Sequence, residues 1–151
     1  MKQGITFGFI NGIIDMLALL TGLWATKVSK VGIIGAMVAL IISNPLNDSY
    51  ALYISEESTD SEKAKTKAKN ALISQIATHV VFLLIVIFTP NTRTALMISL
   101  IFSIITIIGF NQYNNINIVS TRNTLLVIVI LVTITYIADH AVFKYFKNLK
   151  I

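Results

Sequence analysis

The chain has 151 residues, of which 55% are hydrophobic and only 13% are charged, and its mean hydropathy is +0.77. Soluble domains carry about 25% charged residues, so this composition predicts a membrane protein and excludes an ordinary water-soluble core. The net charge of +5 does not indicate a nucleic-acid partner, because the lysines lie between the apolar runs and in the tail. The absence of cysteine excludes disulfides, thiolate metal sites and a cysteine nucleophile.

Five apolar runs are long enough to cross a bilayer core of about 30 Å as helices. The expected spans are 5–25, 31–57, 71–89, 94–110 and 124–143. The short polar segment 56–70 is expected to form an amphipathic helical extension that leads directly into the third span, and Ser58 or Asp60 can cap it. No alternation typical of a β-barrel is present. The sequence therefore predicts an all-α, multi-pass membrane protein, with residues 1–151 forming a single transmembrane domain.

The first span carries an acid within an apolar run. Asn11 and Asp15 are four residues apart, so they share one face of a helix. An ionisable side chain inside the bilayer is rare and costs about 2.5–3.5 kcal/mol on insertion scales. Two interpretations stay open: a polar face that lines a cation path, or a helix contact held by hydrogen bonds.

The second span is long and should be kinked at Pro45. Proline lacks the N–H that would bond the Ile41 carbonyl, so a backbone oxygen is freed inside the membrane. Asn44 and Asp48 again lie four residues apart on one face. Carboxylates and amides beside a broken helix are how transporters assemble ion sites. The alternative is a simple kink whose polar groups satisfy the freed backbone.

If the first two spans pack antiparallel, their polar faces reach a similar depth. Carboxylate and amide oxygens suit Mg²⁺, Ca²⁺ and Mn²⁺ and, less decisively, Fe²⁺. Without a cation, neighbouring acids can carry protons, which is the physical basis of metal/proton exchange. The candidate metal-binding residues are Asp15, Asp48, Asn11, Asn44, Glu56 and Glu57. The two glutamates either collect cations at the overhanging end of the second span or belong to a solvated face.

Other polar residues are weaker candidates. Gln75 and His79 share a face of the third span, where a lone histidine is more often a packing residue than a ligand. Asp139 and His140 lie near the end of the last span, where interfacial snorkelling explains them. A stripe on the fourth span is expected to hold it to a neighbouring helix; it consists of Ser99, Ser103 and Thr106.

The loop charges do not orient the protein. One side carries Lys2, Lys63, Lys65, Lys67, Lys69 and Arg122, and the other carries Lys27, Lys30, Arg93, Lys144, Lys147 and Lys150. The positive-inside rule is therefore undecided, and the choice of membrane is open. No catalytic or nucleotide-binding motif is present, so we expect no enzymatic activity.

The run Asn11–Leu23 resembles the first helix of the vacuolar iron transporter family. That helix reads Asp-Gly, a few apolar or small residues, and a hydrophobic stretch ending in Ala-Gly or Thr-Gly. The segment Tyr50–Glu57 is similar to the family's second-helix segment ending in Tyr-Leu and Ser-Glu. Asn11 stands at the family's first-helix aspartate, and Asn44 lies near its metal-binding methionine. The short segment 56–70 replaces the family's glutamate-rich metal-binding domain.

The resemblance implies a homodimer with an ion path at its two-fold axis, lined by the first two helices. It also implies exchange of Fe²⁺ or Mn²⁺ for protons, with no cofactor besides the transported cation, and a cytosolic N-terminus. Replacing methionine sulfur by amide and carboxylate oxygen favours harder ions. The sequence thus predicts a divalent-cation transporter, and the alternative is a non-transporting membrane scaffold or subunit.

Overall fold

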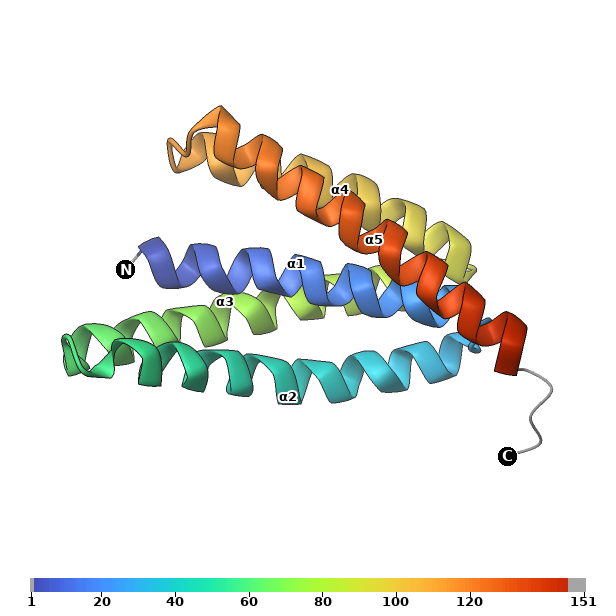
Figure 1. Cartoon of the computed structure of the whole chain (residues 1–151), viewed down its shortest axis with the longest axis horizontal. Helices are drawn as coiled ribbons and strands as arrows, with labels where there is room; N and C mark the ends of the chain where they lie inside the picture. The colour runs from blue at the N-terminus through green and yellow to red at the C-terminus, as the bar shows by residue number, and fades with distance from the viewer. Residues whose placement is uncertain (1, 147–151) are drawn as a thin grey trace.

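The computed structural model describes residues 2–146, which fold into five α-helices and contain no strand. The helices are α1 (Lys2–Ala25), α2 (Lys30–Glu57), α3 (Ser61–Phe88), α4 (Thr92–Tyr113) and α5 (Ile118–Phe146). All five are long and apolar enough to cross a membrane. The predicted all-α membrane architecture is confirmed (Figure 1). Lys147 and Lys150, predicted to form a basic tail, lie outside the described residues.

Helix α3 begins before its apolar run and takes in most of the polar segment 56–70, as the helical extension expected there predicts. Asp60 is its N-cap and accepts a hydrogen bond from the Lys63 N–H. The Lys63 ammonium also pairs with the Asp60 carboxylate at 2.7 Å. These contacts with Lys63 hold the pKa of Asp60 below its ordinary value. Ser58, the other predicted cap, instead ends α2.

Helix α2 is long, as predicted, and contains the buried residue Pro45 in its interior. The chain remains helical on both sides of the proline. At the first residue of α2, Lys30 donates hydrogen bonds from Nζ to the carbonyls of Ile87 and Thr89. These bonds hold the start of α2 to the end of α3, because the Lys30 ammonium group satisfies carbonyls that the last turn of α3 leaves free.

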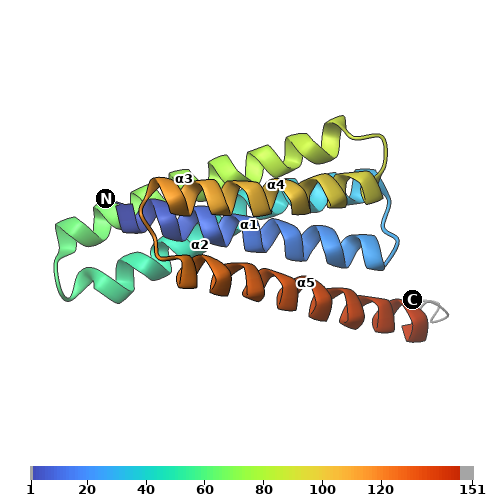
Figure 2. The ribbon, with the colours of Figure 1, turned by 90° about the horizontal axis from the view of Figure 1, so that it is seen from above.

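Helix α1 is the centre of the bundle and contacts each of the other helices. Helix α2 returns antiparallel to α1, as the short linker between them predicts, and α3 runs parallel to α1 (Figure 1). Helix α3 packs extensively along both α1 and α2, whereas α1 and α2 touch each other only lightly. Helices α4 and α5 lie on the other side of α1 (Figures 1 and 2).

Glycines bring α1 and α3 unusually close. A Cβ placed at Gly4 or Gly8 would collide with the backbone carbonyl of Lys67 or Ala71 in α3. Gly12, one turn further along, faces the Thr78 side chain. Small residues allow this approach between membrane helices, where packing and polar contacts take the place of the hydrophobic effect. The stripe formed by Gly4, Gly8 and Gly12 therefore allows the backbones of α1 and α3 to approach closely.

The interior is apolar and the outward faces are apolar as well. Ile13, Met16 and Leu17 of α1 pack in one buried cluster with Phe82 of α3 and Ile107 of α4. Large aliphatic side chains also remain exposed on the outer faces of α2 and α5, among them Val31, Ile42, Leu46, Val129, Ile130 and Ile134. Such faces are suited to contact with lipid acyl chains. These features are those of a multi-pass integral membrane protein.

Candidate functional site

Three helices each contribute a pair of polar side chains at the same level of the bundle. The spacing of four residues places both members of each pair on one helix face. The pairs are Asn11 and Asp15 on α1, Asn44 and Asp48 on α2, and Gln75 and His79 on α3. We call these six residues the polar cluster.

Gln75 joins the two acids. Its Nε2 donates a hydrogen bond to Asp15 Oδ2 at 2.9 Å and another to Asp48 Oδ2 at 2.7 Å. One buried amide nitrogen therefore bridges carboxylates from two other helices. The arrangement follows from the packing, because α3 contacts both α1 and α2 while these two barely touch.

Two asparagines complete the links between α1 and α2. Asn11 Nδ2 donates to Asp48 Oδ2 at 3.2 Å, across the two helices. The Asn44 side chain of α2 lies near enough to the Asp15 carboxylate of α1 to interact with it electrostatically. The four residues singled out within these two spans thus come together.

His79 is the residue whose position the sequence indicated least clearly. Its side chain has no exposed surface, and its Nε2 lies 3.5 Å from Asp15 Oδ2. Neither ring nitrogen has a hydrogen-bond partner, and the same is true of Gln75 Oε1. Sequence reasoning favoured a packing role for His79. The available signal was its four-residue spacing from Gln75, which matches the spacing of the acid–amide pairs.

The six side chains of the polar cluster differ in how much of their surface is exposed. Gln75 and His79 are fully buried, whereas the Asp15 side chain keeps 20% of its surface exposed. Asn11, Asn44 and Asp48 are half-buried. The α3 members of the cluster are therefore enclosed, whereas the α1 and α2 members keep part of their surface exposed.

Glu56 and Glu57 do not join the polar cluster. Glu56 pairs with Lys67 at 2.6 Å, and Glu57 accepts a hydrogen bond from the Tyr53 hydroxyl. At a rise of 1.5 Å per residue, both glutamates lie roughly 12 Å or more from Asp48 along the axis of α2. Within residues 2–146, no three histidine, aspartate or glutamate side chains are arranged to hold a metal ion. A cation at the cluster must therefore also use amide oxygens or shift the side chains.

The remaining polar candidates lie elsewhere. Asp139 of α5 sits against α1, where a Cβ at Gly22 would meet its carboxylate. His140 is exposed and stacks on Tyr136, with 5.7 Å between ring centroids. Ser99 and Ser103 are fully buried on α4, but Ser103 and Thr106 donate to carbonyls of their own helix and Ser99 Oγ has no partner, so no hydrogen bond of this stripe to a neighbouring helix is described. None of these residues contacts the polar cluster through a described hydrogen bond.

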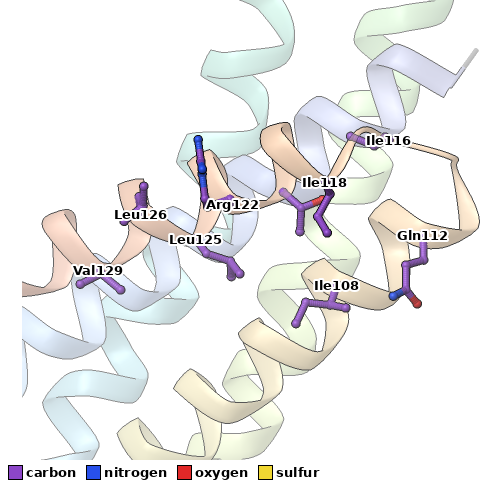
Figure 3. Close-up of a pocket in the computed structure, with 9 residues that line it drawn as sticks. Ile108, Gln112, Ile116, Ile118, Arg122, Leu125, Leu126 and Val129 are labelled. Atoms are coloured by element: carbon purple, nitrogen blue, oxygen red, sulfur yellow. The ribbon is translucent and has the colours of Figure 1, made fainter.

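A cavity of about 450 Å³ lies between the end of α4 and the start of α5 (Figure 3). Its walls are mostly aliphatic, and Arg122 extends away from the hollow. The lining residues are Ile108, Gln112, Ile116, Ile118, Thr121, Arg122, Leu125, Leu126 and Val129. The cavity contains no acid, so it differs chemically from the polar cluster.

Comparison of the chain with protein-family models, curated proteins and solved structures gives no match. Functional reasoning therefore rests on the polar cluster and on the membrane architecture.

Proposed function

We propose that this protein is a membrane carrier that exchanges a divalent metal cation for protons, with the polar cluster as its binding site. The observation that carries the proposal is a charge imbalance. Asp15 and Asp48 meet between membrane-crossing helices, no described lysine or arginine pairs with either acid, and His79, 3.5 Å from Asp15, can offset at most one of the two charges. Carboxylates without a counter-charge are costly inside a bilayer. A divalent cation between them would balance both charges.

Proton exchange follows from the same imbalance. Two carboxylates that share one amide donor repel each other when both are ionised. Protons can neutralise them while no cation is bound, and cation entry then releases these protons. The half-buried position of Asp15 and Asp48 supports this cycle, since a fully enclosed site could not exchange its ion.

A second copy of this chain is the proposed partner. Asn47 is exposed in the interior of α2, adjacent in sequence to Asp48, and no hydrogen bond of its side chain is described. Lipid offers an amide no partner, whereas another α2 helix does. The resemblance to the vacuolar iron transporter family also implies a homodimer with its path between the first two helices. It further suggests Fe²⁺ or Mn²⁺ as the cation.

A specific observation favours the second candidate, a membrane scaffold that transports nothing. Gln75 already satisfies both carboxylates, and its two bonds tie three helices together. Such a network can hold a bundle in place without binding any ion. The two candidates differ in one respect that can be measured, namely whether cations cross the membrane.

The test is reconstitution of the purified full-length protein into liposomes that contain a Mn²⁺-sensitive dye and a pH-sensitive dye. The carrier proposal predicts Mn²⁺ uptake above that of protein-free liposomes, with protons leaving the lumen at the same time. An acidic lumen should accelerate the uptake. Flux at the protein-free level, with correctly folded protein in the liposomes, would favour the scaffold. Uptake without proton movement would contradict the exchange step alone.

A further inference from the structure

Gln75 Nε2 occupies the place where a cation would balance the two acids. It lies 2.9 Å from Asp15 Oδ2 and 2.7 Å from Asp48 Oδ2. An amide N–H group carries only a partial positive charge, so it relieves the repulsion between the carboxylates without neutralising them. Amide nitrogen and oxygen differ little in size, and rotation about the last side-chain bond exchanges them. That rotation would turn Gln75 Oε1 toward the carboxylates.

Three buried polar atoms of the polar cluster lack hydrogen bonds. They are Gln75 Oε1 and the two ring nitrogens of His79. Both side chains are fully buried, and His79 Nε2 lies 3.5 Å from Asp15 Oδ2. Buried polar atoms are nearly always satisfied, and an unsatisfied group is a common sign of a water or ion site. His79 Nε2 therefore faces the acid that a cation would contact, at a distance that forms an ion pair when the imidazole is protonated.

We propose that His79 supplies a nitrogen ligand and Gln75 Oε1 an oxygen ligand to a cation held between Asp15 and Asp48. This inference rests on the proposed function and deepens it by naming the substrate class. Cation entry rotates the Gln75 amide, replaces its N–H donors, and draws the imidazole onto the ion. The titratable groups that face the site are the two aspartates and His79 alone among the described residues.

The ligand set selects transition metals. Imidazole nitrogen suits iron, zinc, nickel and copper, whereas Mg²⁺ and Ca²⁺ prefer sites made of oxygen alone. With His79 as a ligand, the site favours first-row divalent transition metals over Mg²⁺ and Ca²⁺. The four residues predicted from α1 and α2 supply only oxygen, so it is His79 of α3 that changes the expected selectivity.

Pulsed electron paramagnetic resonance of Mn²⁺ added to the purified full-length protein tests nitrogen ligation directly. We expect the nitrogen modulation of a bound imidazole in the wild type and in His140→Gln, and its loss in His79→Gln. His140 is the matched control because it is the other histidine of the chain and is exposed on α5. Bound Mn²⁺ without nitrogen modulation in the wild type would overturn the inference, whatever the variants do. Absence of any bound Mn²⁺ would overturn it as well.

Competition in the liposome assay separates this inference from the proposed function. Mn²⁺ uptake by the wild type should resist a large excess of Mg²⁺. His79→Gln should weaken Mn²⁺ binding by roughly tenfold or more, as loss of groups that support a metal site typically does, and should make uptake sensitive to Mg²⁺. Uptake that Mg²⁺ inhibits equally in the wild type and in His79→Gln would leave a carrier but refute the role of His79. Absence of any uptake would instead refute the carrier.

Discussion

A single atom of Gln75 links α3 to both α1 and α2. Its Nε2 is the donor that Asp15 and Asp48 share; no described lysine or arginine pairs with these acids, and the nearest basic group is His79 Nε2, 3.5 Å from Asp15 Oδ2. A buried hydrogen bond to a charged group contributes about 1.5–3 kcal/mol, and a buried acceptor left without a donor is costly. The stability of the bundle without a cation should therefore depend on this amide.

Replacing Gln75 by leucine tests that dependence. The change removes both bonds while keeping a side chain of similar size, so it should lower the free energy of unfolding by about 2–4 kcal/mol. Thermal or denaturant unfolding in detergent measures the difference. Gln112→Leu is the control, because that glutamine is exposed and its loss should change stability by less than about 0.5 kcal/mol. Equal effects of the two substitutions would contradict the bridging role.

For the polar cluster, the sequence predicted which side chains share a helix face, but it did not predict which side chains touch between helices. The intervals from Asn11 to Asp15 and from Asn44 to Asp48 predicted which side chains share a face. They could not show that an amide from α3 would lie between the acids. That contact depends on the rotation and depth of α3, which the glycine stripe of α1 determines through packing. The position of His79 beside Asp15 could not be predicted for the same reason.

At the scale of helices, close packing of α1 on α3 holds the polar cluster together. Gly8→Ala should place a methyl group against the Ala71 carbonyl and lower stability by about 1–3 kcal/mol, because backbone cannot move aside cheaply. Gly35 of α2 has nothing near its Cβ position. Gly35→Ala should therefore raise stability by about 0.5–1 kcal/mol. Unfolding in detergent measures both, and a loss of similar size in the two variants would contradict the close contact.

The start of α3 should respond to pH. The pKa of Asp60 is lowered by Lys63, so the contribution of this cap is complete above the ordinary aspartate pKa and is lost as the pH falls through the lowered value. Hydrogen exchange of the first α3 amides should accelerate, relative to the intrinsic rate, over that acidic range. In Asp60→Asn the side chain still caps the helix but cannot titrate, so the acceleration should disappear. An unchanged pH profile in Asp60→Asn would exclude Asp60 as its source.

The five helices could be predicted from apolar run length, and the polar start of α3 could be predicted from its candidate caps. Helix α3 extends back to Ser61 through lysine-rich turns, where Asp60 caps it. The start of α5 was not predicted, because the bilayer requirement fixes a minimum length for each span and says nothing about polar turns beyond it. Helix α5 begins at Ile118, before its predicted start at 124, and the Asn117 side chain accepts a hydrogen bond from the Val119 N–H there.

At the scale of the whole molecule, α1 is enclosed while α2 has a face without a partner. The sequence predicted that α1 and α2 are antiparallel neighbours, yet their main partner is α3. Which helices pack most closely depends on shape along their whole length, and short linkers do not fix it. The exposed Asn47 amide on α2 points to contact with a second copy of the chain.

The absence of cysteine makes a single introduced cysteine a clean probe of that contact. Asn47→Cys should form a disulfide-linked dimer on mild oxidation in liposomes, because the proposed dimer places two α2 helices side by side. Ile105→Cys is the control, since Ile105 is equally outward-facing on α4, with 64% of its surface exposed. Electrophoresis without reductant reads the result. Cross-linking at residue 105 but not at 47 would place the interface elsewhere.

Mn²⁺ uptake by aspartate variants in liposomes tests the central claim most directly, namely that Asp15 and Asp48 form one cation site. Asp15→Asn and Asp48→Asn each halve the acidic charge of the site, so each should reduce uptake by about tenfold or more. The double variant should be no worse than the stronger single one. Asp139→Asn, which removes the acid on α5 outside the polar cluster, should transport normally. Full uptake by folded Asp15→Asn and Asp48→Asn protein would contradict the account.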